Sequence, residues 1–511
     1  MQSHSRYTGH PLIDMGVATL VVATGTSSPT EIEKEKIEVF IDDELVPVYI
    51  NPAMSNYLGS VLFGNVNFAN PAMNTNPKFD EKRRQRLKAW FTVALETDPN
   101  DRDQLMSLID GFRQGPRTDW LLPADVEIPD PGERCAFSGD LAVIRVSRII
   151  VPMTGSEDAL NFVPQGRPRL PIAGWVLLAM LAMPMGTLNS GGQVLLPHTM
   201  DYGLLQKLAA HALEQNRRAI QMEGLNKRPN YRFARTQVLK TLLELGARGP
   251  RIYPLTVYKF SSSAQNAKLE IFTLETRVMA FIMQAKYRHA RAWNTIVQRA
   301  WYLDAQPNEA PALTKKGEQI YERRNYFYEG LFSLPQAAPA FMRRYLLRQR
   351  QPGVPKGKSK HDPRYHYSSY EEREVISWDL IKLFMEMMMD ISKDRIDAIQ
   401  ILADRLAMYI SHTDKRLYGR LFRCRKGHEL RSELIRAANR VKEQGREPIL
   451  PYREFITAFF YEDKGNDSIL REDWFLARDL LMIRLIESLA PDVIVENADL
   501  IDEATEDLLE D

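Results

Sequence analysis

The most apolar stretch of the chain covers residues 170–185 and reads LPIAGWVLLAMLAMPM. A membrane-spanning helix needs about 20 consecutive apolar residues. This stretch is shorter, and Pro171 and Pro184 interrupt it. It therefore predicts a helix that is buried in a protein core and apolar on all sides. At 511 residues, the chain is long enough to build such a core and to form two or three domains.

The composition indicates an ordinary globular protein of a reducing compartment. Hydrophobic residues make up 44% of the chain and charged residues 26%, which is typical of globular domains. The two cysteines, Cys135 and Cys424, provide no disulfide framework. The first dozen residues lack a basic region that leads into an apolar core, so we expect no signal peptide. We expect a cytoplasmic protein with no membrane partner.

The net charge of +1 conceals an uneven distribution. Nine of the 66 acidic residues lie in residues 491–511, which contain no basic residue. The rest of the chain therefore carries 67 basic residues against 57 acidic ones. An acidic tail on a basic body is either a solvating tail or a screen over a nucleic-acid groove.

The apolar patterning predicts a mainly helical α+β fold, in which a mixed N-terminal domain with short strands precedes a C-terminal helical bundle. Helices are expected at 78–97, 102–112 and, almost without interruption, after residue 274. Short β-rich runs occur at 141–146, 193–196, 252–259 and 269–273. The polar residues 261–266 between the last two runs predict a hairpin.

A basic linker rich in Pro, Gly and Lys is predicted at 349–367, because it has almost nothing to bury. It would separate a mixed α/β domain at 1–348 from a helical bundle at 368–490, which the acidic tail follows. The bundle is predicted from helical spacing of apolar residues, such as Ile396, Ile399, Leu402, Leu406 and Tyr409. Met387 lies in a methionine cluster, and methionine is typical of irregular cores.

No motif of catalytic chemistry is recognised in the chain. The sequence GVPKGKS at 353–359 has three residues between its glycines, whereas a phosphate-binding loop needs four. His361-Asp362 lacks the further ligands that metal-dependent phosphohydrolysis requires. We expect a binding protein without catalytic residues. Two alternatives stay open: a metal-dependent nuclease or phosphohydrolase with an unfamiliar site, and a scaffold that contacts only proteins.

Three basic regions are predicted to contact a nucleic-acid backbone, because phosphate neutralisation supplies most sequence-independent affinity. The first contains Arg343, Arg344, Arg348, Lys356 and Lys358. The second contains Lys415, Arg416, Arg420, Arg423 and Lys426, with positions 416, 420 and 423 on one helical face. The third contains Arg217, Arg218, Lys227, Arg228 and Arg232. Each region alone is equally typical of a solvated helix face, but three in one chain favour nucleic acid.

Loop residues with amide or guanidinium groups are candidates to read base edges. They are Asn161, Gln165, Arg167, Arg169, Asn189 and Gln193. Asn161 also has a structural interpretation, in which its side chain satisfies loop backbone while Phe162 packs.

Residues 135–199 are laid out like a two-knuckle zinc segment that has lost most of its ligands. Cys135-Ala136-Phe137-Ser138 stands at the first CxxC position, and Ala173-Gly174-Trp175-Val176 at the second. A tetrahedral zinc site needs four donors, which one cysteine cannot supply. We therefore expect no bound zinc and no other cofactor. Apolar packing of Trp175 and Val176 would replace the metal.

The order of motifs resembles the large subunit of type I (I-A/I-B-like) CRISPR Cascade complexes, in the subtype with paired CxxC motifs. The blocks that carry the resemblance are TGHPLIDMGVATLV (8–21), then IVPMTGS, NFVP, LPIAGWVLLAM, PMG and SGGQVLLPHT within 135–199, and PLTVYKFSSSAQNAKLEIF (254–272). They cover parts of the first 300 residues, and the C-terminal third matches only in general character. The lost cysteines are the clear departure.

The resemblance implies a non-catalytic subunit of an RNA-guided surveillance complex. Such a subunit recognises a short flanking motif (PAM) in duplex DNA, supports unwinding, and stabilises the displaced strand along its C-terminal bundle. The implied partners are the guide crRNA, the target double-stranded DNA, the backbone, handle-binding and small helical subunits, and helicase–nuclease or transposition proteins. In several subtypes of this family a small helical subunit is produced from the C-terminal end of the large one, so the resemblance implies a start at Met387 as the alternative to core packing of the methionine cluster. The motif that is read stays open, as does the choice between target degradation and transposition.

Overall fold

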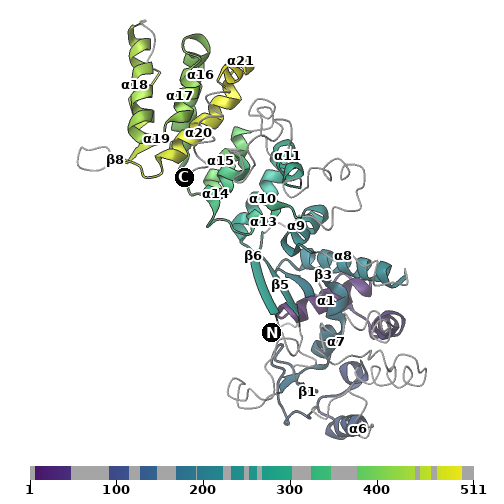
Figure 1. The fold of residues 1–511 in the computed structure, drawn as a ribbon. Coiled ribbons are helices and arrows are strands. Elements are labelled where there is room, and N and C mark those ends of the chain that lie inside the picture. Colours follow the sequence, from purple (N-terminus) through teal and green to yellow (C-terminus); the bar gives the residue numbers. More distant parts are fainter. Residues whose placement is uncertain are drawn as a thin grey trace. The chain divides into compact units, whose positions relative to one another are not determined.

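The structure is a computed structural model of the chain (Figure 1). It describes residues 6–47, 91–113, 127–146, 169–190, 193–221, 232–246, 252–261, 268–301, 324–346, 377–443, 449–461 and 469–497. The fold is α+β and mainly helical, which confirms the predicted class. Two compact units divide the chain: Met1–Glu275 with Glu318–Arg323, and Thr276–Gly317 with Arg324–Asp511.

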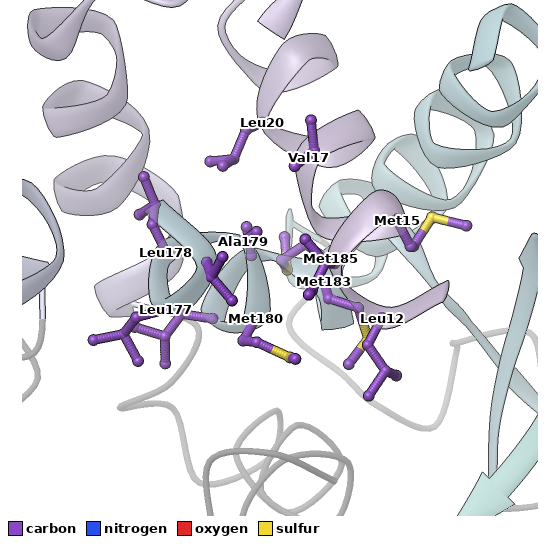
Figure 2. Close-up of a cluster of buried hydrophobic side chains, with 14 of the residues drawn as sticks. Leu12, Met15, Val17, Leu20, Leu177, Leu178, Ala179, Met180, Met183 and Met185 are labelled. Carbon is purple, nitrogen blue, oxygen red and sulfur yellow. The ribbon is translucent and has the colours of Figure 1, made fainter. Parts of the chain in front are cut away.

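The first unit is built around helix α1 (Pro11–Ala23), which is buried from Leu12 to Val21. Helix α7 (Gly174–Ala182) and the 3-10 turn η6 (Met183–Gly186) pack against it. Figure 2 shows their leucine, valine and methionine side chains gathered into one cluster. The predicted apolar helix is therefore confirmed as a buried core element. No helix in the described part of the chain is long and apolar enough to cross a membrane.

The close approach of α1 and α7 depends on Gly16. A Cβ atom at this position would lie 1.9 Å from the carbonyl oxygen of Ala179 and 2.5 Å from its carbonyl carbon. Both are backbone atoms of a packed helix, so they cannot move aside without shifting α7. Glycine is therefore the residue that this helix crossing accommodates.

A four-stranded antiparallel sheet, in the order β3-β4-β5-β6, completes the core of the first unit. Its strands are β3 (Leu188–Ser190), β4 (Gln193–His198), β5 (Leu255–Ser261) and β6 (Lys268–Leu274). The register of β5 and β6 runs from Leu255 opposite Leu274 to Ser261 opposite Lys268. This pairing confirms the predicted hairpin.

A buried carboxylate joins the start of α1 to the sheet. Asp14 is fully buried, and its oxygens accept hydrogen bonds from the backbone N–H groups of Thr8 (2.7 Å) and Gly9 (3.1 Å). Its Oδ2 also lies 3.0 Å from Nε2 of His198 on β4. Because each carboxylate oxygen has a partner, the burial of Asp14 is compensated.

The other described elements of the first unit are two short strands and several helical segments. Strand β1 (Ile144–Val146) pairs antiparallel with β2 (Leu170–Ile172). The helical elements are η1 (Pro29–Glu31), α2 (Lys34–Phe40), η2 (Ile41–Leu45), α6 (Arg102–Arg113), α8 (Tyr202–Gln221) and α9 (Ala234–Leu245). Helix α6 confirms the expectation at 102–112. The helix expected at 78–97 is described only from residue 91, and residues 91–96 are helical.

The second unit begins with helices that share an aromatic core. Phe384 stacks on Phe341, with ring centroids 5.4 Å apart, and meets Phe281 edge-on at 5.3 Å. The elements involved or adjacent are α10 (Thr276–Arg288), α11 (Ala290–Ala300), α13 (Tyr326–Leu331), α14 (Ala338–Phe341), η9 (Met342–Leu346) and α15 (Trp378–Met388).

This core corrects the predicted domain boundary. Helices before and after the predicted linker at 349–367 pack together, so the compact units divide after Glu275 instead. The linker itself lies outside the described residues.

The C-terminal helices form the predicted bundle around α16 (Lys393–His412), against which α19 (Tyr452–Phe459) and α20 (Trp474–Ser488) pack. The predicted apolar positions of α16 are all buried. Helix α15 is linked to α16 by hydrogen bonds from Trp378 Nε1 to Gln400 (3.0 Å) and from Lys382 to Asp397 (2.7 Å). The other elements are α17 (Leu417–Arg423), α18 (Gly427–Glu443), β7 (Phe460–Tyr461), β8 (Ile469–Leu470) and α21 (Pro491–Glu496).

Candidate nucleic-acid interface

Helices α17 and α18 carry a strong excess of positive charge. Residues 414–443 contain ten basic side chains against four acidic ones. Eight of the cations are exposed: Arg416, Arg423, Arg425, Lys426, Arg431, Arg436, Arg440 and Lys442. We call these eight residues the basic surface. An excess of this kind on adjacent helices attracts a polyanion.

The amphipathic sequence of α18 explains why its cations face outward. The buried stripe of this helix consists of Leu430, Leu434, Ala437 and Val441. These positions recur every three or four residues, so the basic residues between them are left at the surface. At the start of the helix, the carboxylate of Glu429 accepts hydrogen bonds from the backbone N–H groups of Arg425 (2.8 Å) and Lys426 (3.1 Å). This cap fixes the turn between α17 and α18.

Two largely buried carboxylates hold three arginines in place at the basic surface. Asp414 Oδ2 accepts hydrogen bonds from Arg420 (2.8 Å) and Arg440 (2.9 Å). Glu433 accepts hydrogen bonds from Arg420 (2.8 Å) and Arg436 (2.9 Å). The side chains of Arg436 and Arg440 nevertheless stay 70% and 57% exposed. The network therefore keeps a net positive charge and positions two outward guanidinium groups before any ligand binds.

The predicted basic helix face of Arg416, Arg420 and Arg423 is only partly present in the structure. Arg416 is the exposed residue that precedes α17, and Arg423 is exposed at its end. Arg420 lies between them, but both of its hydrogen-bonding edges are directed to carboxylates. The prediction did not foresee this structural role.

Sequence reasoning missed Arg436 and Arg440, which are the most clearly positioned cations of the surface. Their spacing of four residues on a predicted helix was a signal that they share a face. The basic residues between 431 and 442 are interleaved with apolar ones, so they do not stand out as a run of charge.

Lys415, another predicted backbone contact, is covered by acidic residues of α21. Its Nζ lies 2.8 Å from Asp492 Oδ2 and 3.2 Å from Glu496 Oε1. The hydrogen bonds to Asp492 and Glu496 raise the pKa of the Lys415 ammonium group.

The third predicted region is not gathered into one surface by the described residues. Arg217 makes a bidentate ion pair with Glu44, in which Nε lies 2.8 Å from Oε2 and Nη2 lies 2.6 Å from Oε1. These hydrogen bonds raise the pKa of the Arg217 guanidinium. Arg218 pairs with Glu214 one turn away on α8. Arg232 is exposed and lies over the ring of its neighbour Phe233. Lys227 and Arg228 lie outside the described residues.

The first predicted region lies mostly outside the described residues. The backbone of Arg343 and Arg344 belongs to η9. Arg348, Lys356 and Lys358 fall in the part of the chain that the structure does not describe.

The base-reading candidates do not come together among the described residues. Arg169 pairs with Glu127, its carbonyl accepts a hydrogen bond from Arg145 (2.8 Å), and its side chain is 13% exposed. Asn189 lies opposite Val194 and Gln193 opposite Ser190, so these two amides project from opposite faces of the β3–β4 ribbon. Asn161, Gln165 and Arg167 lie outside the described residues.

The two segments of the zinc-like layout do lie against each other. The turn from Cys135 to Asp140 is closed by a backbone bond of 2.7 Å between these two residues. Trp175 at the start of α7 then donates its indole N–H to the Asp140 carboxylate at 2.8 Å. Cys135 itself is a buried free cysteine. No group of three or more potential metal ligands occurs in the described part of the chain.

No family model, curated protein or solved structure matches this chain. The basic surface and the motif order are therefore the observations from which its function is inferred.

Proposed function

We propose that this chain is a non-catalytic nucleic-acid-binding protein that contacts phosphate backbones through the basic surface of α17 and α18. The observation that carries this proposal is the network of Asp414 and Glu433, which holds Arg436 and Arg440 outward. Guanidinium groups that are already ordered lose less conformational entropy on binding. Each can then donate two hydrogen bonds to a phosphate.

At the level of family, we propose the large subunit of an RNA-guided Cascade complex. The motif order in residues 8–21, 135–199 and 254–272 supports this assignment. In that role, guide RNA pairing selects the target, and the chain contributes flanking-motif recognition, duplex opening and contact with the displaced strand. The basic surface suits the displaced strand, because single strands are followed by cationic tracks.

Salt-dependent binding of a fluorescent single-stranded oligonucleotide tests the proposed contact. Variants should avoid Arg420, because its replacement would also remove one of the two arginine partners of Asp414 and one of the two of Glu433. A triple variant, Arg416→Gln, Arg431→Gln and Lys442→Gln, removes three exposed charges outside the network. If all three contact phosphates, the slope of log affinity against log salt should fall by about 2 to 3.

A matched control replaces Lys34 and Lys36 on α2, which are similarly exposed, by glutamine. The control should bind like the parent chain. Equal affinities and equal slopes for the triple variant and the parent would show that the basic surface is not the contact.

The family-level proposal is tested by the nucleic acid that copurifies with the chain and its partners. An RNA of one fixed length is expected, because each guide is processed to a defined size. Divalent-metal-dependent cleavage by the purified chain would instead support a nuclease. Absence of any salt-dependent RNA or DNA binding would support a protein-only scaffold.

A further inference from the structure

Helix α21 is anchored at the start of the basic helices. Its acidic residues Asp492 and Glu496 both reach the ammonium group of Lys415. The fully buried Asn497 donates a hydrogen bond to the carbonyl oxygen of Lys415 at 2.9 Å, and Val493 is buried beside it. This combination of buried groups and ion pairs fixes the chain at residue 497 next to Lys415, one residue from the arginine-binding Asp414.

The sequence that leaves this anchor is strongly acidic. Residues 498–511 contain seven carboxylates and no basic residue. A chain of 14 residues reaches up to about 46–50 Å when extended. The 17 residues of α18 extend about 25 Å. The acidic segment is therefore long enough to reach any part of the basic surface from its anchor.

We propose that residues 498–511 dock on the basic surface of the same chain and compete there with nucleic acid. The competition rests on the proposed function, whereas the docking itself rests on the anchor and on charge complementarity. The contacts of Asp492 and Glu496 with Lys415 lie in α21, directly before this segment, and bring its start to the basic helices. Tethering gives the segment an effective concentration near the millimolar range, so weak contacts suffice.

The docking is reversible for physical reasons. Exposed ion pairs are individually weak and are screened by salt. A nucleic acid presents a denser line of charge and releases its own counterions on binding. A bound strand therefore displaces the acidic segment, while weak, scattered anions do not. As a consequence, the basic surface would bind nucleic acid and exclude other polyanions whose charge density is low.

Zero-length carbodiimide crosslinking tests the docking without any nucleic acid. This reagent joins carboxylates to lysine amines that already touch. At low salt we expect links between residues 498–511 and Lys426 or Lys442, and their loss at about 0.5 M salt, where screening is strong. The link between Lys415 and Asp492 serves as the internal positive control. If that link forms and no tail carboxylate is joined to the basic surface, the docking is wrong.

An equal mixture of isotopically light and heavy chains separates the two possible occupants of the surface. Links within one isotope type support docking in the same chain. Mixed links in the proportion expected for random pairing would assign the contact to a second copy and overturn the proposal.

Removal of the acidic segment tests the competition. A chain that ends at Asn497 keeps α21, and a second variant of full length carries Asn and Gln in place of the acidic residues of 498–511. Both should bind a short oligonucleotide roughly three- to tenfold more tightly at low salt, with the difference vanishing at high salt. Equal binding by parent and variants would overturn the competition. If no form binds, the proposed function fails, and the crosslinks alone decide the docking.

Discussion

Trp175 and Asp140 are joined by a hydrogen bond of 2.8 Å from the indole N–H to the carboxylate. This bond connects the two segments at which paired cysteines would meet around a zinc ion in the layout that the sequence resembles. The backbone N–H of Ala136 also donates to the carbonyl oxygen of Pro171 at 2.9 Å. Hydrogen bonds and packing thus hold these two segments of the first unit together.

If these contacts take the place of a structural zinc site, a chelator should leave the free energy of unfolding unchanged, whereas loss of the indole donor should lower it. We expect Trp175→Phe to lower the free energy of unfolding by about 0.5–1.5 kcal/mol, the usual net contribution of one hydrogen bond. Denaturation with and without EDTA provides the measurement, and Asp140→Asn in both backgrounds isolates the pair. One tightly held equivalent of zinc in elemental analysis would contradict this account.

Gly16 should tolerate no larger side chain. Gly16→Ala places a methyl group against the backbone of Ala179, and overpacking of a tight core costs about 1–3 kcal/mol. The matched control is Gly203→Ala on α8, where the nearest atom to the new methyl group is 3.4 Å away. That change should be neutral or slightly stabilising, because alanine restricts the unfolded chain. Equal midpoints of urea denaturation for the two variants would refute the close crossing of α1 and α7.

Stability should fall as pH decreases below neutrality, because burial disfavours the protonated form of two histidines in the fold. Burial lowers the pKa of His10 and of His211, while unfolded histidine titrates near 6.5. Since the unfolded chain then binds more protons, this contribution is complete above about pH 6.5 and is lost as the pH falls toward the folded values. Urea midpoints at about pH 7.5 and 5.5 measure the effect.

The double variant His10→Gln and His211→Gln should flatten this pH dependence. Exposed His412 provides the control, and His412→Gln should leave the slope of the parent chain intact. A slope that both variants share would assign the pH dependence to other groups.

Cys424 should resist thiol reagents in the folded protein. Burial, aided by the carboxylates of Glu433 and Glu429, raises the pKa of its thiol to about 11. At pH 8 very little reactive thiolate is therefore present. In a Cys135→Ser background, Ellman's reagent should label no thiol under native conditions and one thiol after unfolding. Rapid stoichiometric labelling of the native chain would mean that Cys424 is accessible.

Local patterns predicted the elements of the fold better than their grouping. The buried helix and the β5–β6 hairpin were recognisable because their signals are contained in short stretches: an apolar run, and β-prone residues around a polar turn. The domain boundary was wrong because Phe384 packs on Phe341 and Phe281, contacts that join helices on both sides of the linker. Nothing in a single sequence indicates which helices share a core.

The same limit applies to the basic surface. Its excess of charge was visible in part, because Arg416, Arg423 and Lys426 lie close together in the sequence. The structural role of Arg420 could not be seen in the sequence, because it depends on a hydrogen bond to Glu433 from the next helix. Charge composition thus located the region, while the pairing of individual arginines required the fold.

The position of α15 determines what a shorter product that starts at Met387 would lack. A second product that starts at Met387 would lack nearly all of α15, including Trp378 and Lys382. It would keep the mutual packing of α16, α19 and α20, but Gln400 and Asp397 would lose their partners from α15. One reading frame would then encode both a complete chain and a free bundle whose uncovered side is the one that α15 occupies in the complete chain.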